Sequence, residues 1–416
     1  MWPRFGGVGV VTFAGHSSDL LAGHAYNVVA RRIPRDRRQR AMSRSRPLRP
    51  DRSRTAGEEL ARAVAGAGLG SRLPLPDEPV PDPDFEELLG IVGHHRLVGA
   101  LAELAHAGSF PVTERQLQSL TSHHTDWVRL AIEVERVLLR VDECFSDGGI
   151  DFRVLKGAAL SHLVYDDPSW RIFTDLDLLV RSDQFDEAVR LARSELGGRQ
   201  VVPELRPGFD REFGKEALIQ VGRVELDIHR TFVSGPFGLT IGLDELFGSE
   251  TPFEVGGRVL PALGALPLFM HACYNLALGD YPVRLCAMRD LLAIRARSNL
   301  DTDAITALAH SWRCTGVVQR AAQLTVDTVG LDSSHSLSGL AQLTTPSREQ
   351  WLLRSYFTPA RSYTRPLASL AVIRGTGARY RYAKALLAPS GEYLRSRGWT
   401  ERSHLRRACD RLLRRG

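Results

Sequence analysis

The sequence predicts an α+β fold, with an α/β core between N-terminal helices and a C-terminal helical domain. Three observations support this prediction. Residues 85–144 repeat apolar residues at intervals of three and four, the spacing of an amphipathic helix. The middle of the chain alternates short apolar strands with helical stretches, which is typical of an α/β core. From about Gly264 onward the pattern is helical again.

The helical lead contains two long stretches. The first is "FEELLGIVGHHRLVGALAELAHAG", and the second is "TDWVRLAIEVERVLLRVDECF", for which Thr125–Asp126 is the expected N-cap. Gly148–Gly149 end the helical pattern. The N-terminal helical region is therefore expected over residues 73–147.

The expected core spans residues 148–262. "DFRVLKGAALSHLVY" predicts a short strand, a glycine turn and a helix, and "RIFTDLDLLV" predicts a second strand. "SDQFDEAVRLARSELGG" follows as a helix capped by Ser182 or Asp183, and "GRVELDIHRTF" is a further strand. The C-terminal helical domain, with a basic tail, is expected over residues 263–416.

Residues 1–72 are expected to be a disordered, Arg-rich extension. Eleven arginines and two aspartates lie between Arg31 and Arg54, a local charge of +9 in a chain whose net charge is +6. The basic balance therefore belongs to this arm. The arm could bind nucleic acid, or it could be a solvated tail or translated upstream sequence before a true start at Met42.

Composition excludes two classes of protein. No run of 18 or more apolar residues is present, so no membrane span is expected. Five dispersed cysteines without a CxxC pair predict free thiols in a reducing, cytoplasmic compartment and argue against a zinc site.

Two carboxylates lie in an otherwise apolar strand. In "FTDLDLLV", Asp175 and Asp177 share one face with Phe173 and Leu179. Like charges side by side resist burial unless a positive charge lies between them. A hard divalent cation, Mg²⁺ or alternatively Mn²⁺, is well suited to this role.

A third carboxylate and a phosphate-binding turn complete the expected constellation. In "RVELDIHR", Glu225, Asp227 and His229 share the face opposite the apolar one, and Asp227 is the preferred third ligand. "LKGAAL" places Gly157 between a strand and a helix, where free backbone N–H groups attract phosphate.

This order of motifs resembles the nucleotidyltransferase superfamily that includes DNA polymerase β. "LKGAALSHLVYDDPSWRIFTDLDLLVRSDQFDEA" followed by "VELDIHR" is similar to the bacterial uncharacterised nucleotidyltransferase family, the NTP-transferase type 5 group. The resemblance extends over roughly residues 85–400. It implies a nucleotidyltransferase-type core with a mixed sheet.

The resemblance also implies roles for individual residues. Asp175 and Asp177 would be paired metal ligands, and Asp227 the third carboxylate and candidate base. The expected nucleotide-binding residues are Lys156, Gly157, Ala158, Arg171 and His229. Two interpretations of His229 remain open: it orients Asp227, or it is a structural histidine. Ala158 departs from the superfamily pattern, which has Gly or Ser there, so no hydroxyl is available at that position.

The expected activity is Mg²⁺-dependent transfer of a nucleotidyl group from an NTP, with ATP as the default, to an unidentified small-molecule or protein acceptor. Pyrophosphate is the other product. Two alternatives remain: a non-catalytic nucleotide-binding or regulatory module of the same fold, and a nucleic-acid-modifying enzyme that uses the Arg-rich arm.

Overall fold

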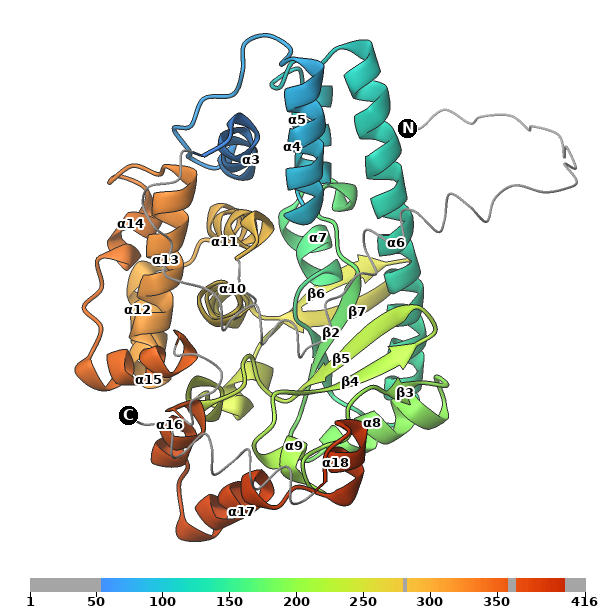
Figure 1. Ribbon diagram of the computed structural model, residues 1–416, viewed down its shortest axis with the longest axis vertical. Coiled ribbons are helices and arrows are strands. Elements are labelled where there is room, and N and C mark those ends of the chain that lie inside the picture. Colours follow the sequence, from blue (N-terminus) through green and yellow to red (C-terminus); the bar gives the residue numbers. More distant parts are fainter. Residues whose placement is uncertain (1–53, 280–282, 358–363, 401–416) are drawn as a thin grey trace, which may run out of the picture. The chain divides into compact units, whose positions relative to one another are not determined.

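A mixed β-sheet packed between helices organises the described part of the chain (Figure 1). A computed structural model describes residues 54–279, 283–357 and 364–400, all within one of the two units into which the chain divides. Among these residues, seven strands pair in the order β3-β4-β5-β2-β1-β7-β6. The strands are β1 (Phe152–Val154), β2 (Asp175–Val180), β3 (Arg199–Gln200), β4 (Glu216–Val221), β5 (Val224–His229), β6 (Glu250–Val255) and β7 (Arg258–Leu263).

The pairing confirms the predicted α+β class. Strand β2 is parallel to β5, and β1 is parallel to β7, whereas the remaining pairs are antiparallel. The apolar face of β5, with Val224, Leu226 and Ile228, is buried against side chains of two helices, α6 (Glu114–Asp147) and α8 (Phe185–Ser194). The alternation of β5 therefore leaves its polar residues on the opposite face of the sheet.

The helical region before the sheet begins earlier than the sequence predicts. Helix α3 (Ala56–Gly66) lies inside the stretch expected to be disordered, so that expectation is wrong for these residues. Thr55 and Glu58 form a capping box at its N-terminus, and Val64 is fully buried in the main apolar cluster. The Arg-rich residues 31–53 lie outside the described residues.

Two predicted helix starts are also wrong. Helices α4 (Asp82–His94) and α5 (Val98–His106) precede α6, which begins after Thr113 and runs without a break through Thr125. A capping box of Thr113 and Gln116 starts α6, so the cap predicted at Thr125–Asp126 is not formed. Helix α8 follows Gln184 and has no side-chain cap from Ser182 or Asp183.

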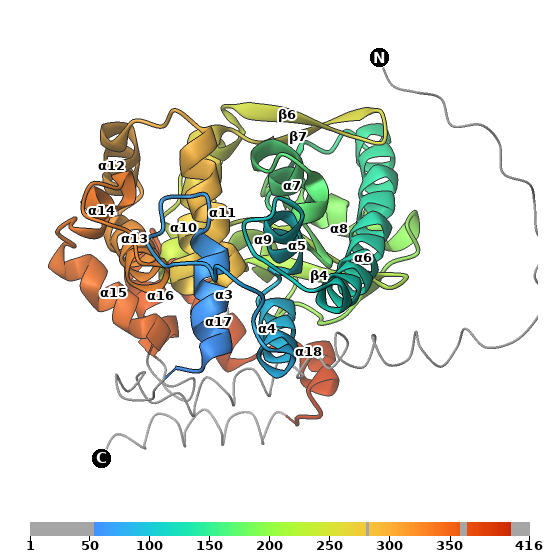
Figure 2. The ribbon, with the colours of Figure 1, turned by 90° about the horizontal axis from the view of Figure 1, so that it is seen from above.

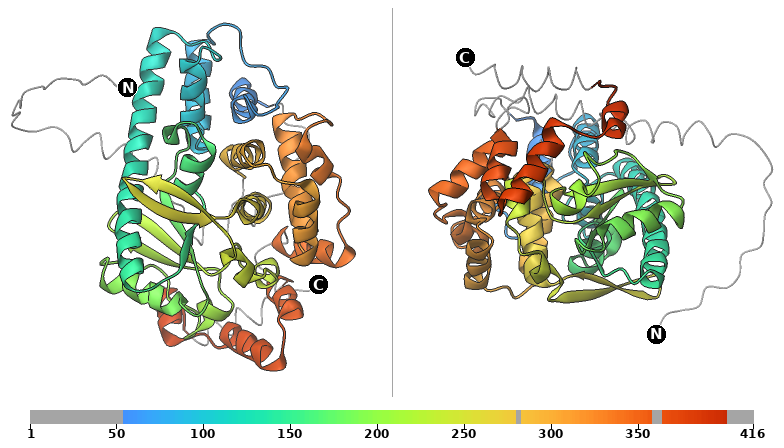
Figure 3. Two further views of the ribbon diagram at one scale, coloured as in Figure 1. Left: turned by 180° about the vertical axis from the view of Figure 1, so that it is seen from behind. Right: turned by 90° about the horizontal axis from the view of Figure 1, so that it is seen from below.

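The C-terminal helices cover the face of the sheet that carries the polar residues. Helices α10 (Ala265–Leu278) and α11 (Leu285–Arg297) lie between the sheet and an outer group of helices, as the views from above and behind also show (Figures 2 and 3). The outer group is α12 (Thr302–Ser311), α13 (Thr315–Val329) and α14 (Ser336–Ala341). Helix α10 is buried almost all round, which explains its continuous apolar sequence.

The last described helices include some that contact the segment between β3 and β4. They are α15 (Ser347–Phe357), α16 (Thr364–Val372), α17 (Thr376–Leu387) and α18 (Gly391–Ser396). Tyr382 of α17 packs on Phe213, and Ser390 N–H donates to Leu205 O over 2.7 Å. None of the described helices is both long enough and apolar enough to cross a membrane. The predicted basic tail at 401–416 lies outside the described residues.

Candidate active site

Parallel pairing of β2 with β5 brings the predicted carboxylates together. Asp177 lies directly opposite Asp227 in the register, and Asp175 lies opposite Glu225. Paired residues of neighbouring strands point to the same face, so all four side chains project from one side of the sheet. Asp177, Asp227 and His229 each offer one ligand atom, and these atoms lie within 4.8 Å of one another. Asp175 is not part of this tightest group.

Two buried oxygen atoms in this group fit a metal ion. Asp177 Oδ2 and Asp227 Oδ1 are buried, and neither accepts a hydrogen bond from the described residues. A buried carboxylate oxygen without a hydrogen bond is costly, and hard divalent cations prefer such oxygens as ligands. The donor set therefore fits the divalent cation that the sequence predicts.

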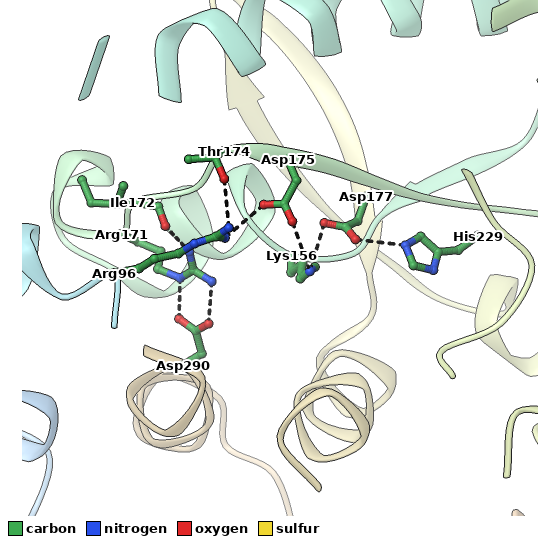
Figure 4. Close-up of polar contacts among 9 residues, drawn as sticks. All are labelled: Arg96, Lys156, Arg171, Ile172, Thr174, Asp175, Asp177, His229 and Asp290. Atoms are coloured by element: carbon green, nitrogen blue, oxygen red, sulfur yellow. Dashed lines mark hydrogen bonds and ion pairs between the residues drawn. The ribbon is translucent and has the colours of Figure 1, made fainter. Parts of the chain in front are cut away.

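Positive side chains of the protein itself lie against the aspartates (Figure 4). Lys156 Nζ lies 3.3 Å from Asp177 Oδ2 and 3.8 Å from Asp175 Oδ2. Arg96 Nη1 donates to Asp175 Oδ1 over 3.0 Å. Burial opposes the charged form of Lys156, but Asp177 and Asp175 outweigh it and raise the pKa of the lysine. Two like charges persist on this strand because these cations offset them.

The environment separates the pKa values of the two central carboxyl groups. Burial, followed by the nearby charges of Glu216 and Asp177, raises the pKa of Asp227 to about 8. Burial also opposes ionisation of Asp177, but Lys156 and a hydrogen bond from His229 hold its pKa below the ordinary value. Without a metal, Asp177 is therefore the carboxylate and Asp227 the proton carrier near neutral pH.

His229 contacts a different aspartate from the one expected. Its Nε2 donates to Asp177 Oδ1 over 2.9 Å, and its side chain is 2% exposed. Its Nδ1 lies 3.7 Å from Glu216 Oε2, and Glu216 is also 2.6 Å from Lys215 Nζ. The interpretation that His229 orients Asp227 is therefore replaced by a contact that orients Asp177.

The glycine turn lies where the sequence predicts it. Gly157 has φ 61° and ψ −111°, and α7 (Ala158–Val164) begins immediately after it. A Cβ at Gly157 would lie 3.3 Å from the side chain of Phe173, so both the backbone angles and the space favour glycine. Ala158 is buried in the first turn of α7. The role of this turn in phosphate binding remains a prediction.

Arg171 pairs with Asp290 of α11, and no described contact joins it to Asp175 or Asp177. Its Nε and Nη2 donate to the carboxylate of Asp290 in α11 over 2.7 and 2.8 Å, and its Nη1 donates to Ile172 O. The arginine is 5% exposed, and Tyr165 also donates to Asp290. These bonds join the sheet region to α11, and we expect Arg171 to keep them, so that its predicted contact with a triphosphate is not supported by the described contacts.

Sequence reasoning missed Arg96, Lys215 and Glu216. Arg96 lies in "HHRLVGAL", a segment that the pattern assigns to one helix. In the structure its φ is 58°, and it lies in the turn between α4 and α5. Its contact with Asp175 joins residues 79 positions apart, and no local pattern signals it. Glu216 could have been found, because it begins a short, mostly apolar strand that a tight turn at Gly222 and Arg223 joins to β5.

Comparison with known protein families identifies the family of this chain. A family model described as uncharacterised nucleotidyltransferase matches residues 81–330, which is more than half of the chain. The chain belongs to this family. The family resemblance inferred from the sequence is thereby confirmed for residues 81–330, and its predicted extension to about residue 400 stays a prediction.

Among solved structures, this nucleotidyltransferase family member is similar to the solution structure of the antibiotic-resistance factor ANT(2'')-Ia. The two share 15% sequence identity, with a TM-score of 0.31, and the match covers 44% of this chain and 92% of that chain. No curated protein matches the chain.

Proposed function

We propose that the protein is a Mg²⁺-dependent nucleotidyltransferase that moves a nucleotidyl group from an NTP to an acceptor hydroxyl. The observation that supports this most directly is the pairing of Asp177 with Asp227, each with a buried oxygen that accepts no hydrogen bond. Asp177 and Asp227 would hold the metal, with Asp175 as the neighbouring ligand. A bound divalent cation would neutralise phosphate charge at this site.

The transfer step assigns further roles to Asp227 and His229. The acceptor oxygen forms a bond to the α-phosphorus, the bond from that phosphorus to the bridging oxygen breaks, and pyrophosphate leaves with the electron pair. Asp227, held ionised by the bound cation, would accept the proton of the acceptor hydroxyl. His229 holds Asp177 in position through Oδ1 and leaves Oδ2 as the ligand atom.

Lys156 and the turn at Gly157, next to the carboxylates, would bind the triphosphate. Lys156 directly precedes the glycine turn, and its ammonium lies against Asp175 and Asp177. Its ammonium and the backbone amides after Gly157 supply the positive potential that phosphates require. ATP is the first NTP to test.

A labelling experiment tests this function. The full chain is incubated with each α-³²P-labelled NTP, Mg²⁺ and fractionated cell extract, and released pyrophosphate and labelled acceptor are measured. Asp177→Asn should abolish both signals. Asp183→Asn is the matched control, because Asp183 is exposed just beyond β2, and this variant should retain them. NTP binding without pyrophosphate release from any NTP or extract would instead favour the non-catalytic module.

A further inference from the structure

Arg96 combines an unusual backbone conformation with a position at the carboxylates. Its φ of 58° is uncommon for a residue with a side chain, and such conformations concentrate at functional sites. The conformation directs the guanidinium onto β2, where Nη1 donates to Asp175 Oδ1 and Nη2 donates to Thr174 Oγ1 over 2.9 Å. The N-terminal helices thereby contribute a cation to the site.

Lys156 and Arg96 form ion pairs with both oxygens of Asp175 and with one oxygen of Asp177. Each oxygen of Asp175 faces a different cation, Oδ1 facing Arg96 and Oδ2 facing Lys156. Lys156 also faces Asp177 Oδ2, the same oxygen that accepts no hydrogen bond (Figure 4). The two cations thus lie where a divalent ion would have to approach the carboxylates.

Arg96 differs from the buried structural arginine of this region. All the described contacts of Arg171 are made inside the protein at 5% exposure, whereas the Arg96 side chain is 15% exposed and that of Lys156 is 23% exposed. Lysine and arginine side chains are long and can exchange one anionic partner for another without moving the backbone. Both cations can therefore turn from carboxylate to phosphate.

Electrostatics then opposes metal binding in the absence of nucleotide. A divalent ion that approaches Asp175 and Asp177 meets the positive charges of Arg96 and Lys156, and these charges weaken its binding. A triphosphate offers both cations new anionic partners and removes this opposition. Coupling of this kind is reciprocal, so the metal strengthens nucleotide binding by the same factor.

We propose that Arg96 and Lys156 are counter-ions of Asp175 and Asp177 that lower the affinity of the site for a metal ion alone. When metal and nucleotide bind together, both side chains pair with the triphosphate instead. This inference rests on the proposed function, since it assumes that the ligand is a metal–NTP complex. It assigns to Arg96 the triphosphate contact that the sequence predicted for Arg171, which pairs with Asp290 instead.

Mn²⁺ titrations followed by electron paramagnetic resonance test this inference without measuring turnover. The full chain is titrated alone and with a non-hydrolysable α,β-methylene ATP analogue. We expect the analogue to raise the Mn²⁺ affinity of the unaltered protein by about fivefold or more. In Arg96→Gln, Mn²⁺ alone should bind about three- to tenfold more tightly, and the effect of the analogue should become smaller without disappearing, because Lys156 remains.

Two further variants complete the test. Arg96→Lys retains the charge and should restore both the weak binding of Mn²⁺ alone and the effect of the analogue. Arg129→Gln removes an exposed arginine of α6 and should change neither value. Folding of each variant is checked by circular dichroism.

The two possible failures have different signatures. If Arg96→Gln is folded and matches the unaltered protein in both titrations, Arg96 is only a structural link and the inference is wrong. If the unaltered protein binds no Mn²⁺ with or without the analogue, the proposed function itself is wrong.

Discussion

Replacing Arg171 with methionine separates a structural role from a role in binding nucleotide. The change removes the two hydrogen bonds to Asp290 and leaves that carboxylate, whose side chain is 4% exposed, with Tyr165 as its remaining described hydrogen-bond donor. Removing one partner of a buried ion pair typically costs about 3–5 kcal/mol, because the other charge stays buried without compensation. We expect Arg171→Met to lower the free energy of unfolding by this amount.

The double variant Arg171→Met/Asp290→Leu measures how much of the lost unfolding free energy comes from the buried, uncompensated carboxylate of Asp290. Replacing both partners by apolar residues of similar size is often close to neutral, so the double variant should recover to within about 1–2 kcal/mol of the unaltered protein. Urea unfolding followed by tryptophan fluorescence gives the free energies. The reasoning is refuted if Arg171→Met unfolds at the same urea concentration as the unaltered protein but no longer binds the ATP analogue.

Three further predictions concern the site. The raised pKa of Asp227 stabilises the metal-free protein fully below its unfolded value of 3.8, and this contribution is lost as the pH rises through about 8. With EDTA present, Asp227→Asn should therefore gain thermal stability over the unaltered protein from pH 5 to pH 9, and a constant difference would contradict this. Gly157→Ala should cost about 1–3 kcal/mol in urea unfolding, because its positive φ and the contact with Phe173 both oppose a Cβ; an unchanged midpoint would show that the turn relaxes. His229→Gln should weaken Mn²⁺ binding about 10–100-fold in the presence of the ATP analogue, since Asp177 loses its orienting partner; unaltered affinity would make His229 merely structural.

Local patterns predicted the strands that carry the site. The alternation of "FTDLDLLV" and "VELDIH" fixes which residues of each strand share a face, and the structure adds the register that places Asp177 opposite Asp227. The capping box of Thr55 and Glu58 was also readable, but the charged composition before it suggested disorder instead. Patterns within a few residues therefore carried most of the correct predictions.

Contacts between distant segments could not be read in this way. Arg171 stands just before the DxD strand, which suggests a phosphate contact, yet its partner Asp290 lies 119 positions later. The cation that joins Asp175 comes from a turn between α4 and α5, 79 positions earlier. Only tertiary packing decides which of several arginines reaches the carboxylates.

The most direct test of the central claim is an anomalous diffraction map from crystals grown with Mn²⁺ and the non-hydrolysable ATP analogue. The account predicts a Mn²⁺ peak at about 2.0–2.6 Å from carboxylate oxygens of Asp177 and Asp227, with Lys156 turned onto the phosphates. A peak elsewhere, or Lys156 still lying between Asp175 and Asp177 beside a bound nucleotide, would contradict it.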